Sequence, residues 1–192
     1  MMNLPNKLTV LRIILTPVFM LTLVWQFPYH YIVALLVFIF ASITDLLDGK
    51  IARQQGIVTD FGKFLDPLAD KMLTTSAFLG FIALGIGKGA VWIAFIVLFR
   101  EFLVSSLRLV AVSSGGKVIA ANIWGKLKTV TQMIAIIYAM AVEQFVEFID
   151  IPVLTLVLQS LTTVFLWISA VICIISGAIY LIDNIKFINS SK

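Results

Sequence analysis

Residues 151–182 read IPVLTLVLQSLTTVFLWISAVICIISGAIYLI, a stretch without one charged side chain. Its apolar residues are continuous rather than alternating, and its length exceeds that of ordinary strands, so the stretch indicates a helix. Only helices and closed barrels cross a bilayer, because lipid offers no partner to backbone N–H and C=O groups. At 1.5 Å per residue this helix would be about 48 Å long. We therefore expect it to tilt in the membrane or to emerge into water near Asp183.

Five further apolar runs precede this segment. They lie at residues 9–27, 30–47, 68–87, 89–112 and 120–142. The 192 residues are 61% apolar and 12% charged, whereas a soluble domain carries about 25% charged residues. This composition excludes an ordinary soluble domain and leaves almost no chain for one. The sequence predicts a single all-α membrane domain over residues 1–192, with six transmembrane helices.

The basic residues predict how these helices are oriented. Six crossings place both termini on one side of the membrane, and 12 of the 14 lysines and arginines fall at the helix ends on that side; the two exceptions are Lys88 and Arg100. By the positive-inside rule, both termini and the connectors at 48–65 and 113–121 face the cytoplasm. The net charge of +4 is explained by this topology in the cytoplasmic (inner) membrane of a cell, and it gives no support for nucleic-acid binding.

Acidic residues gather in one short region. Half of the ten acidic residues lie between positions 45 and 70. Asp45 and Asp48 are three residues apart and share a helix face at the end of the second span. Asp66 and Asp70 are four apart and share a face at the start of the third, where Pro67 is expected in the first turns of the helix. Because a short connector joins these two spans, the four carboxylates are predicted to converge.

Four converging carboxylates predict a site for divalent cations. Like charges in a partly buried site cannot all stay ionised without a counter-charge. Oxygen ligands select a hard ion, so two Mg²⁺ or Mn²⁺ ions are expected, as in sites that catalyse phosphoryl displacement. Gly49 and Ala52 leave room for a ligand beside the acids, and Arg53 can bind a phosphate. Acids at solvated helix ends are the simpler alternative, but charges at membrane depth are costly and usually mark function.

This arrangement resembles the signature of the CDP-alcohol phosphatidyltransferases, six-helix membrane enzymes with a cytoplasmic active site. Every fixed position of that signature is present in the chain. The positions are Asp45, Asp48, Gly49, Ala52, Arg53, Gly62, Asp66 and Asp70.

The resemblance implies roles for individual residues. Asp45, Asp48, Asp66 and Asp70 are expected to bind the metals, and Asp70 is also expected to act as general base. CDP-diacylglycerol is the implied donor substrate. Its expected contacts are Pro5, Asn6, Asp48, Gly49, Ala52, Arg53, Thr59 and Gly62. A homodimer is implied as well.

Other segments resemble the phosphatidylglycerophosphate synthase branch of this family. They are residues 3–12, 100–102 and 125–129, with Arg108 and Gln132. The expected acceptor is therefore sn-glycerol 3-phosphate, and the products are phosphatidylglycerol phosphate and CMP. A phosphate dianion requires a cationic pocket, and a charge within a span is costly unless it lines a wet cavity. The expected pocket consists of Arg100, Arg108, Lys126 and Lys128.

Several alternatives remain open at this point. The acceptor could be phosphatidylglycerol, as in a cardiolipin synthase, or inositol phosphate. The lysines could form a rim that contacts lipid phosphates, and Arg100 could pair structurally with Glu101 or with a neighbouring span. A small transporter also places carboxylates within the membrane, but its sites are expected near the midplane rather than at one edge. A purely structural membrane subunit would need no metal.

Overall fold

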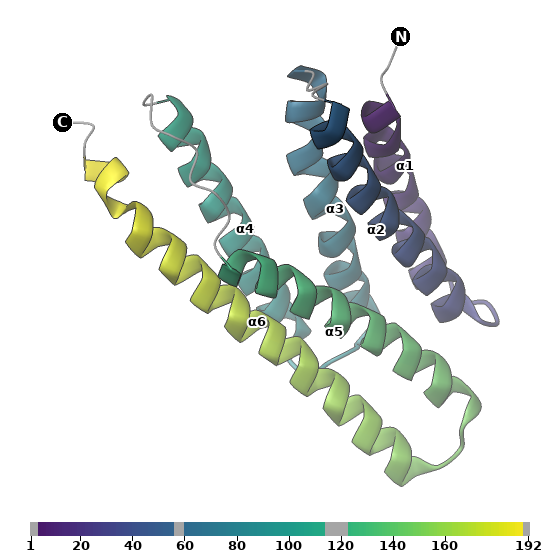
Figure 1. Ribbon diagram of the computed structural model, residues 1–192. Coiled ribbons are helices and arrows are strands. Elements are labelled where there is room, and N and C mark those ends of the chain that lie inside the picture. The colour runs from purple at the N-terminus through teal and green to yellow at the C-terminus, as the bar shows by residue number, and fades with distance from the viewer. Residues whose placement is uncertain (1–3, 56–59, 114–122, 190–192) are drawn as a thin grey trace.

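The computed structural model describes residues 4–55, 60–113 and 123–189, and within these ranges it contains helices and turns but no strand. The predicted all-α class is thus confirmed. The described helices run in chain order as α1 (Leu4–Val24), α2 (His30–Gln55), α3 (Asp60–Leu84), α4 (Ala90–Ser113), α5 (Ile123–Phe148) and α6 (Pro152–Asn189) (Figure 1).

Four of these helices contain segments long and apolar enough to cross a bilayer. The segments are Asn6–Val24, Ala90–Val110, Ile123–Phe148 and Pro152–Asn184. Within the described residues, α2 and α3 carry shorter apolar segments, His30–Asp45 and Lys71–Leu84. The protein is therefore an all-α polytopic membrane protein, and the crossing of the membrane by α2 and α3 stays a prediction.

Helix boundaries differ from the boundaries of the apolar runs. Helix α3 begins at Asp60 rather than near residue 68, so the placement of Pro67 in its first turns was wrong. Helix α6 continues to Asn189, as expected of a helix that emerges into water. Hydrophobicity marks the portion of a helix that lies in lipid, whereas polar residues with good helix propensity extend the helix beyond it.

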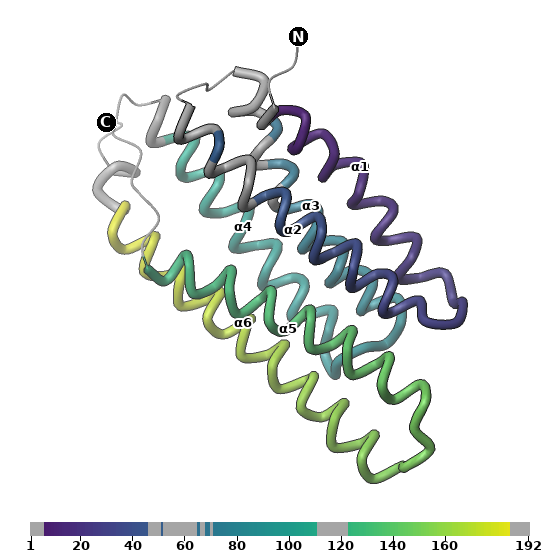
Figure 2. The backbone as a smooth tube through the Cα atoms, turned by 45° about the vertical axis from the view of Figure 1, so that its right-hand side comes forward, coloured from purple at the N-terminus to yellow at the C-terminus, as the bar shows by residue number. Residues whose placement is uncertain are grey.

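The helices form two groups of three. Helix α1 packs along both α2 and α3, whereas α2 and α3 touch each other little in the described part of the chain. Helix α6 packs against both α4 and α5, and the two groups meet mainly through the pairs α2–α5 and α3–α4, with a smaller contact between α3 and α5 (Figures 1 and 2). Aromatic packing supports the first group, where the ring centroids of Phe19 and Phe38 lie 5.4 Å apart and both side chains are fully buried.

The candidate site residues gather toward one end of this bundle. The start of α1, the end of α2, the start of α3 and the end of α6 all point to the same end (Figure 1). The turn between α3 and α4 lies at the other end, where Gly85, Gly87 and Gly89 have φ values of 71°, 80° and 76°. These left-handed conformations favour glycine. The Trp167 indole of α6 donates a hydrogen bond of 3.0 Å to the Lys88 carbonyl, which fastens the turn to α6.

Candidate functional site

The signature positions lie on two helices. Asp45, Asp48, Gly49, Ala52 and Arg53 belong to α2, and Gly62, Asp66 and Asp70 belong to α3. Of these side chains, the structure describes only that of Asp45. The side chains of the other seven and of Pro5, and the whole of Thr59, lie outside the described part. The convergence of four carboxylates therefore remains a prediction from sequence spacing.

Asp45 is held by a buried arginine of α1. The Arg12 Nη1 atom lies 2.5 Å from Asp45 Oδ1, and the Arg12 side chain is 1% exposed whereas that of Asp45 is 42% exposed. One carboxylate oxygen is thus paired on the buried side while the group keeps access to solvent. Burial of an arginine is tolerated when a charge-assisted hydrogen bond compensates it. The pairing fixes where the first predicted metal-binding carboxylate stands.

Sequence reasoning placed Arg12 among the cytoplasmic basic residues and in the segment 3–12 that resembles a branch of the family, but it gave Arg12 no role in the site. The signal that it missed is a polar face on the otherwise apolar helix α1. Asn6, Thr9, Arg12 and Thr16 recur at intervals of three or four residues, and all four are buried. Such spacing puts them on one side of the helix, where they face the protein rather than lipid. Asn6, an expected contact of the donor substrate, is therefore buried on the same face as Arg12.

A second polar cluster joins α4, α5 and α6. Glu101 of α4 forms ion pairs through the same oxygen, Oε1, with Arg100 Nη1 at 3.2 Å and with Lys128 Nζ of α5. Arg100 Nη2 donates a hydrogen bond of 2.8 Å to Ser176 Oγ of α6. Both cations are buried. The pairing of Arg100 with Glu101 and with a neighbouring helix, left open from the sequence, is thus present.

The same cluster extends to α3. Lys71, the residue after Asp70, donates a hydrogen bond of 3.4 Å to the Glu101 carbonyl and another to Ser105 Oγ. The cluster therefore lies next to the segment that carries two of the predicted metal-binding carboxylates. Sequence reasoning missed Lys71, Glu101 and Ser176 as members of this site. Nothing in a single sequence sets the rotation of α6 against α4, which is what brings Ser176 to Arg100.

The four basic residues that were predicted to form one pocket differ in burial. Arg100 and Lys128 are buried side by side around Glu101. Arg108 and Lys126 are exposed, and in the described part of the chain neither pairs with Glu101. Arg108 and Lys126 therefore have the exposure expected of a rim at the membrane surface.

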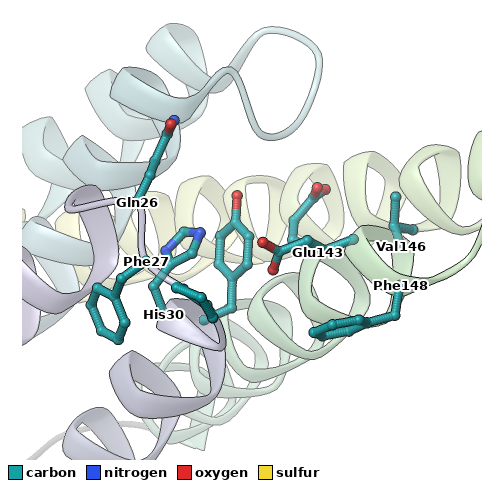
Figure 3. A pocket seen from close by; sticks show the side chains of 9 residues that line it. Gln26, Phe27, His30, Glu143, Val146 and Phe148 are labelled. Atoms are coloured by element: carbon teal, nitrogen blue, oxygen red, sulfur yellow. The ribbon is translucent and has the colours of Figure 1, made fainter.

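A cavity of about 620 Å³ lies at the end of the bundle opposite the candidate site (Figure 3). Its walls come from the turn between α1 and α2, from the start of α2 and from the end of α5, and they include His30, Tyr31, Glu143 and Glu147. His30 is buried and its Nδ1 atom is 3.0 Å from the Leu23 carbonyl oxygen. Two carboxylates with no lysine or arginine in the wall disfavour anionic substrates. This cavity is not part of the candidate site.

The donor set at the ends of α2 and α3 fits hard divalent cations. Asp45 offers a carboxylate oxygen that is open to solvent, and the other predicted ligands are carboxylates as well. Among the side chains that the structure describes, no three of His, Cys, Asp or Glu converge on one point, because the other three aspartates lie outside that set. The solvent-accessible carboxylate of Asp45 therefore suits a hard cation, and the arrangement of the metals remains a proposal.

Comparisons with known proteins match this chain to one family. The family model described as CDP-alcohol phosphatidyltransferase matches residues 2–175. The chain is 35% identical over 204 positions to the CDP-diacylglycerol–glycerol-3-phosphate 3-phosphatidyltransferase of Bacillus subtilis (strain 168), with 100% of both chains covered. It is 38% identical to the protein of the same name from Rickettsia bellii (strain RML369-C), with 93% of each covered.

A relative with a different printed name is more similar over a shorter region. This is a "probable phosphatidylglycerophosphate synthase" of Mycobacterium tuberculosis (strain ATCC 25618 / H37Rv), 44% identical over 137 residues. The alignment covers 70% of this chain and 64% of that protein.

Proposed function

This chain belongs to the CDP-alcohol phosphatidyltransferase family, and we propose that it transfers the phosphatidyl group of CDP-diacylglycerol to sn-glycerol 3-phosphate. The products are phosphatidylglycerol phosphate and CMP. The observation that carries this proposal is full-length similarity to a relative whose name states both substrates. The buried cationic cluster of Arg100 and Lys128 supports the choice of a phosphorylated acceptor.

The donor substrate is proposed to bind at the ends of α2 and α3. Asp45, Asp48, Asp66 and Asp70 would hold two divalent cations, Mg²⁺ or Mn²⁺, which neutralise the pyrophosphate and the charge that develops on the leaving group. Arg12 holds one oxygen of Asp45 and so restrains that carboxylate before any ligand arrives. The proposed contacts of the nucleotide and its phosphates are Pro5, Asn6, Asp48, Gly49, Ala52, Arg53, Thr59 and Gly62.

Asp70 is proposed to act as the general base. Its carboxylate accepts the proton of the primary hydroxyl group of glycerol 3-phosphate. The hydroxyl oxygen then attacks the phosphorus atom that carries diacylglycerol. The bond from this phosphorus to the bridging oxygen of the pyrophosphate breaks, and CMP leaves with the electron pair. The contact of Lys71, the residue after Asp70, with α4 supports a location of the base near the proposed acceptor site.

The proposed location is the cytoplasmic membrane, with the active site on the cytoplasmic side. The distribution of lysines and arginines supports this orientation, as does the gathering of the signature at the end of the bundle where α1 begins. Assembly as a homodimer is proposed from the family resemblance.

The function is tested by offering purified enzyme a panel of acceptors and measuring the release of CMP from CDP-diacylglycerol. Glycerol 3-phosphate should support turnover, because the proposed pocket is cationic. Phosphatidylglycerol, inositol phosphate and unphosphorylated glycerol should support little. Preferential turnover with phosphatidylglycerol or inositol phosphate would replace the proposed acceptor while leaving the family intact.

The two pairs of basic residues should differ in their effect on acceptor binding. A charge-assisted hydrogen bond contributes about 1.5–3 kcal/mol, so Arg100→Ala and Lys128→Ala should each raise the KM for glycerol 3-phosphate about 10- to 150-fold. Arg108→Ala and Lys126→Ala should have smaller effects because both side chains are exposed. Steady-state kinetics in mixed micelles, with each substrate varied in turn, measures these constants.

Two controls accompany this measurement. The KM for CDP-diacylglycerol should change little in all four variants, because the donor signature lies on other helices. Arg100→Lys should restore only part of the affinity, since a planar fork of donors is replaced by a point charge. If neither buried cation affects the dependence on glycerol 3-phosphate, the acceptor lies elsewhere.

A further inference from the structure

We infer that Glu101 is a positioning residue of the acceptor site, which holds Arg100 and Lys128 together as one clamp for a phosphate monoester. This inference rests on the proposed function and deepens it. Glu101 is an acid in a pocket proposed to bind an anion, so its place there requires an explanation. Its contacts supply one, because its carboxylate contacts both cations and leaves part of their hydrogen-bonding capacity unused.

Glu101 keeps two buried cations adjacent. Arg100 and Lys128 come from different helices, and both pair with the single oxygen Oε1 of Glu101. Two positive side chains that are about 90% buried repel each other strongly, because the surroundings screen charge poorly. The carboxylate between them offsets this repulsion and sets their separation. Loss of its charge should let the two side chains move apart.

Glu101 and helix α6 together fix the orientation of Arg100. Its guanidinium is held on one side by Glu101 and on another by Ser176 of α6. Gly177, the next residue of α6, lies so close that a Cβ atom there would be 3.0 Å from Arg100 Cγ. Helix α6 thus provides both a hydrogen-bond partner and the space for the aliphatic part of Arg100. The side chain is confined to one direction before any ligand binds.

Among the described residues, the buried Arg100 Nε atom finds no hydrogen-bond acceptor. An unsatisfied buried donor on a charged group is costly, and such a group in a native structure requires an explanation, for which a bound ion or ligand is one candidate. A phosphate oxygen is a suitable acceptor, because the guanidinium offers parallel N–H groups that match phosphate geometry.

Charge favours an anion at this cluster. Glu101 contributes one negative charge against the two positive charges of Arg100 and Lys128, with which it pairs. The three side chains together therefore keep a positive charge, which attracts an anionic phosphate.

The test is Glu101→Gln, which keeps the size of the side chain and removes its charge. We expect the KM for glycerol 3-phosphate to rise at least about tenfold, as for loss of a charge-assisted contact, with little change in the KM for CDP-diacylglycerol. The matched control is Glu143→Gln, which makes the same change in a partly buried glutamate of the distant cavity. Its kinetic constants should equal those of the wild type.

A binding measurement without turnover completes the test. Glycerol 3-phosphate should raise the Tm of the detergent-solubilised wild type and of Glu143→Gln, and should raise that of Glu101→Gln much less. Glu101→Asp keeps the charge but shortens the reach to the two cations, so its KM should lie between those of wild type and Glu101→Gln. If Glu101→Gln does not fold, the Asp variant decides: a wild-type KM there overturns the inference.

The two proposals fail in different ways. If the wild type prefers another acceptor, the proposed function fails whatever Glu101 does. If the wild type uses glycerol 3-phosphate and folded Glu101→Gln retains its KM and its ligand-induced Tm shift, only the role of Glu101 is overturned. A lower KM in Glu101→Gln also overturns it, because the carboxylate would then compete with the phosphate rather than position its partners.

Discussion

Asp70→Asn is expected to lower kcat by a factor of about 10²–10⁴, the usual contribution of a positioned general base. The amide is nearly the same size as the carboxylate but cannot accept the proton of the acceptor hydroxyl group. CDP-diacylglycerol should still bind, because Arg53 and three aspartates of the signature remain. Single-turnover release of CMP, compared with equilibrium binding of the donor substrate, separates the chemical step from binding.

Asp150→Asn is a suitable control for this substitution. Asp150 is exposed in the turn between α5 and α6, at the opposite end of the bundle, and it has no place in the proposed mechanism. Its variant should turn over at the wild-type rate. Near wild-type turnover of Asp70→Asn would assign the base to another group, such as a water molecule.

Removal of divalent cations is expected to abolish turnover. Four carboxylates at the ends of two helices need a counter-charge, which divalent cations would supply together with Arg12, the partner of Asp45. Enzyme dialysed against EDTA should be inactive and should recover when Mg²⁺ or Mn²⁺ is added. Asp45→Asn, Asp48→Asn and Asp66→Asn should each abolish turnover.

Metal binding itself provides a readout that is independent of turnover. Binding of Mn²⁺ to the purified protein, followed by the loss of the free-ion signal in electron paramagnetic resonance, should weaken in each of the three aspartate variants. Asp150→Asn should bind Mn²⁺ as the wild type does. Full activity of metal-free enzyme would remove the two-metal proposal, and unchanged Mn²⁺ affinity in all three variants would place the ions elsewhere.

The helical class was predictable because the apolar runs are continuous and longer than ordinary strands. The start of α3 was not, because residues 60–67 are polar enough to resemble a connector yet form helix. Hydropathy reports on the solvent around a helix, and it does not report where backbone hydrogen bonding begins. The same limitation explains why α1 begins at Leu4, ahead of the apolar run at residue 9.

Spacing within one helix could be used from the sequence alone, whereas contacts between helices could not. The spacing of Asp45 and Asp48, and of Asp66 and Asp70, predicts that each pair shares a helix face, and this stays a prediction because three of the four side chains lie outside the described part. The cost of a charge within a span pointed to Arg100, which is buried beside Glu101. The sequence offered Glu101 as a partner of Arg100, but its second ion pair, with Lys128 of α5, depends on how α4 and α5 pack.

The position of α1 has a consequence for biosynthesis. In the described residues α2 and α3 touch each other little, and α1 bridges them while supplying Arg12 to Asp45. These three helices are also the first to leave the ribosome, and folding during synthesis proceeds from the N-terminal side. All the helices that carry the signature, together with the helix that spaces them, are therefore made before α4. The half of the enzyme proposed to bind the nucleotide can therefore assemble while the rest of the proposed acceptor site is still being translated.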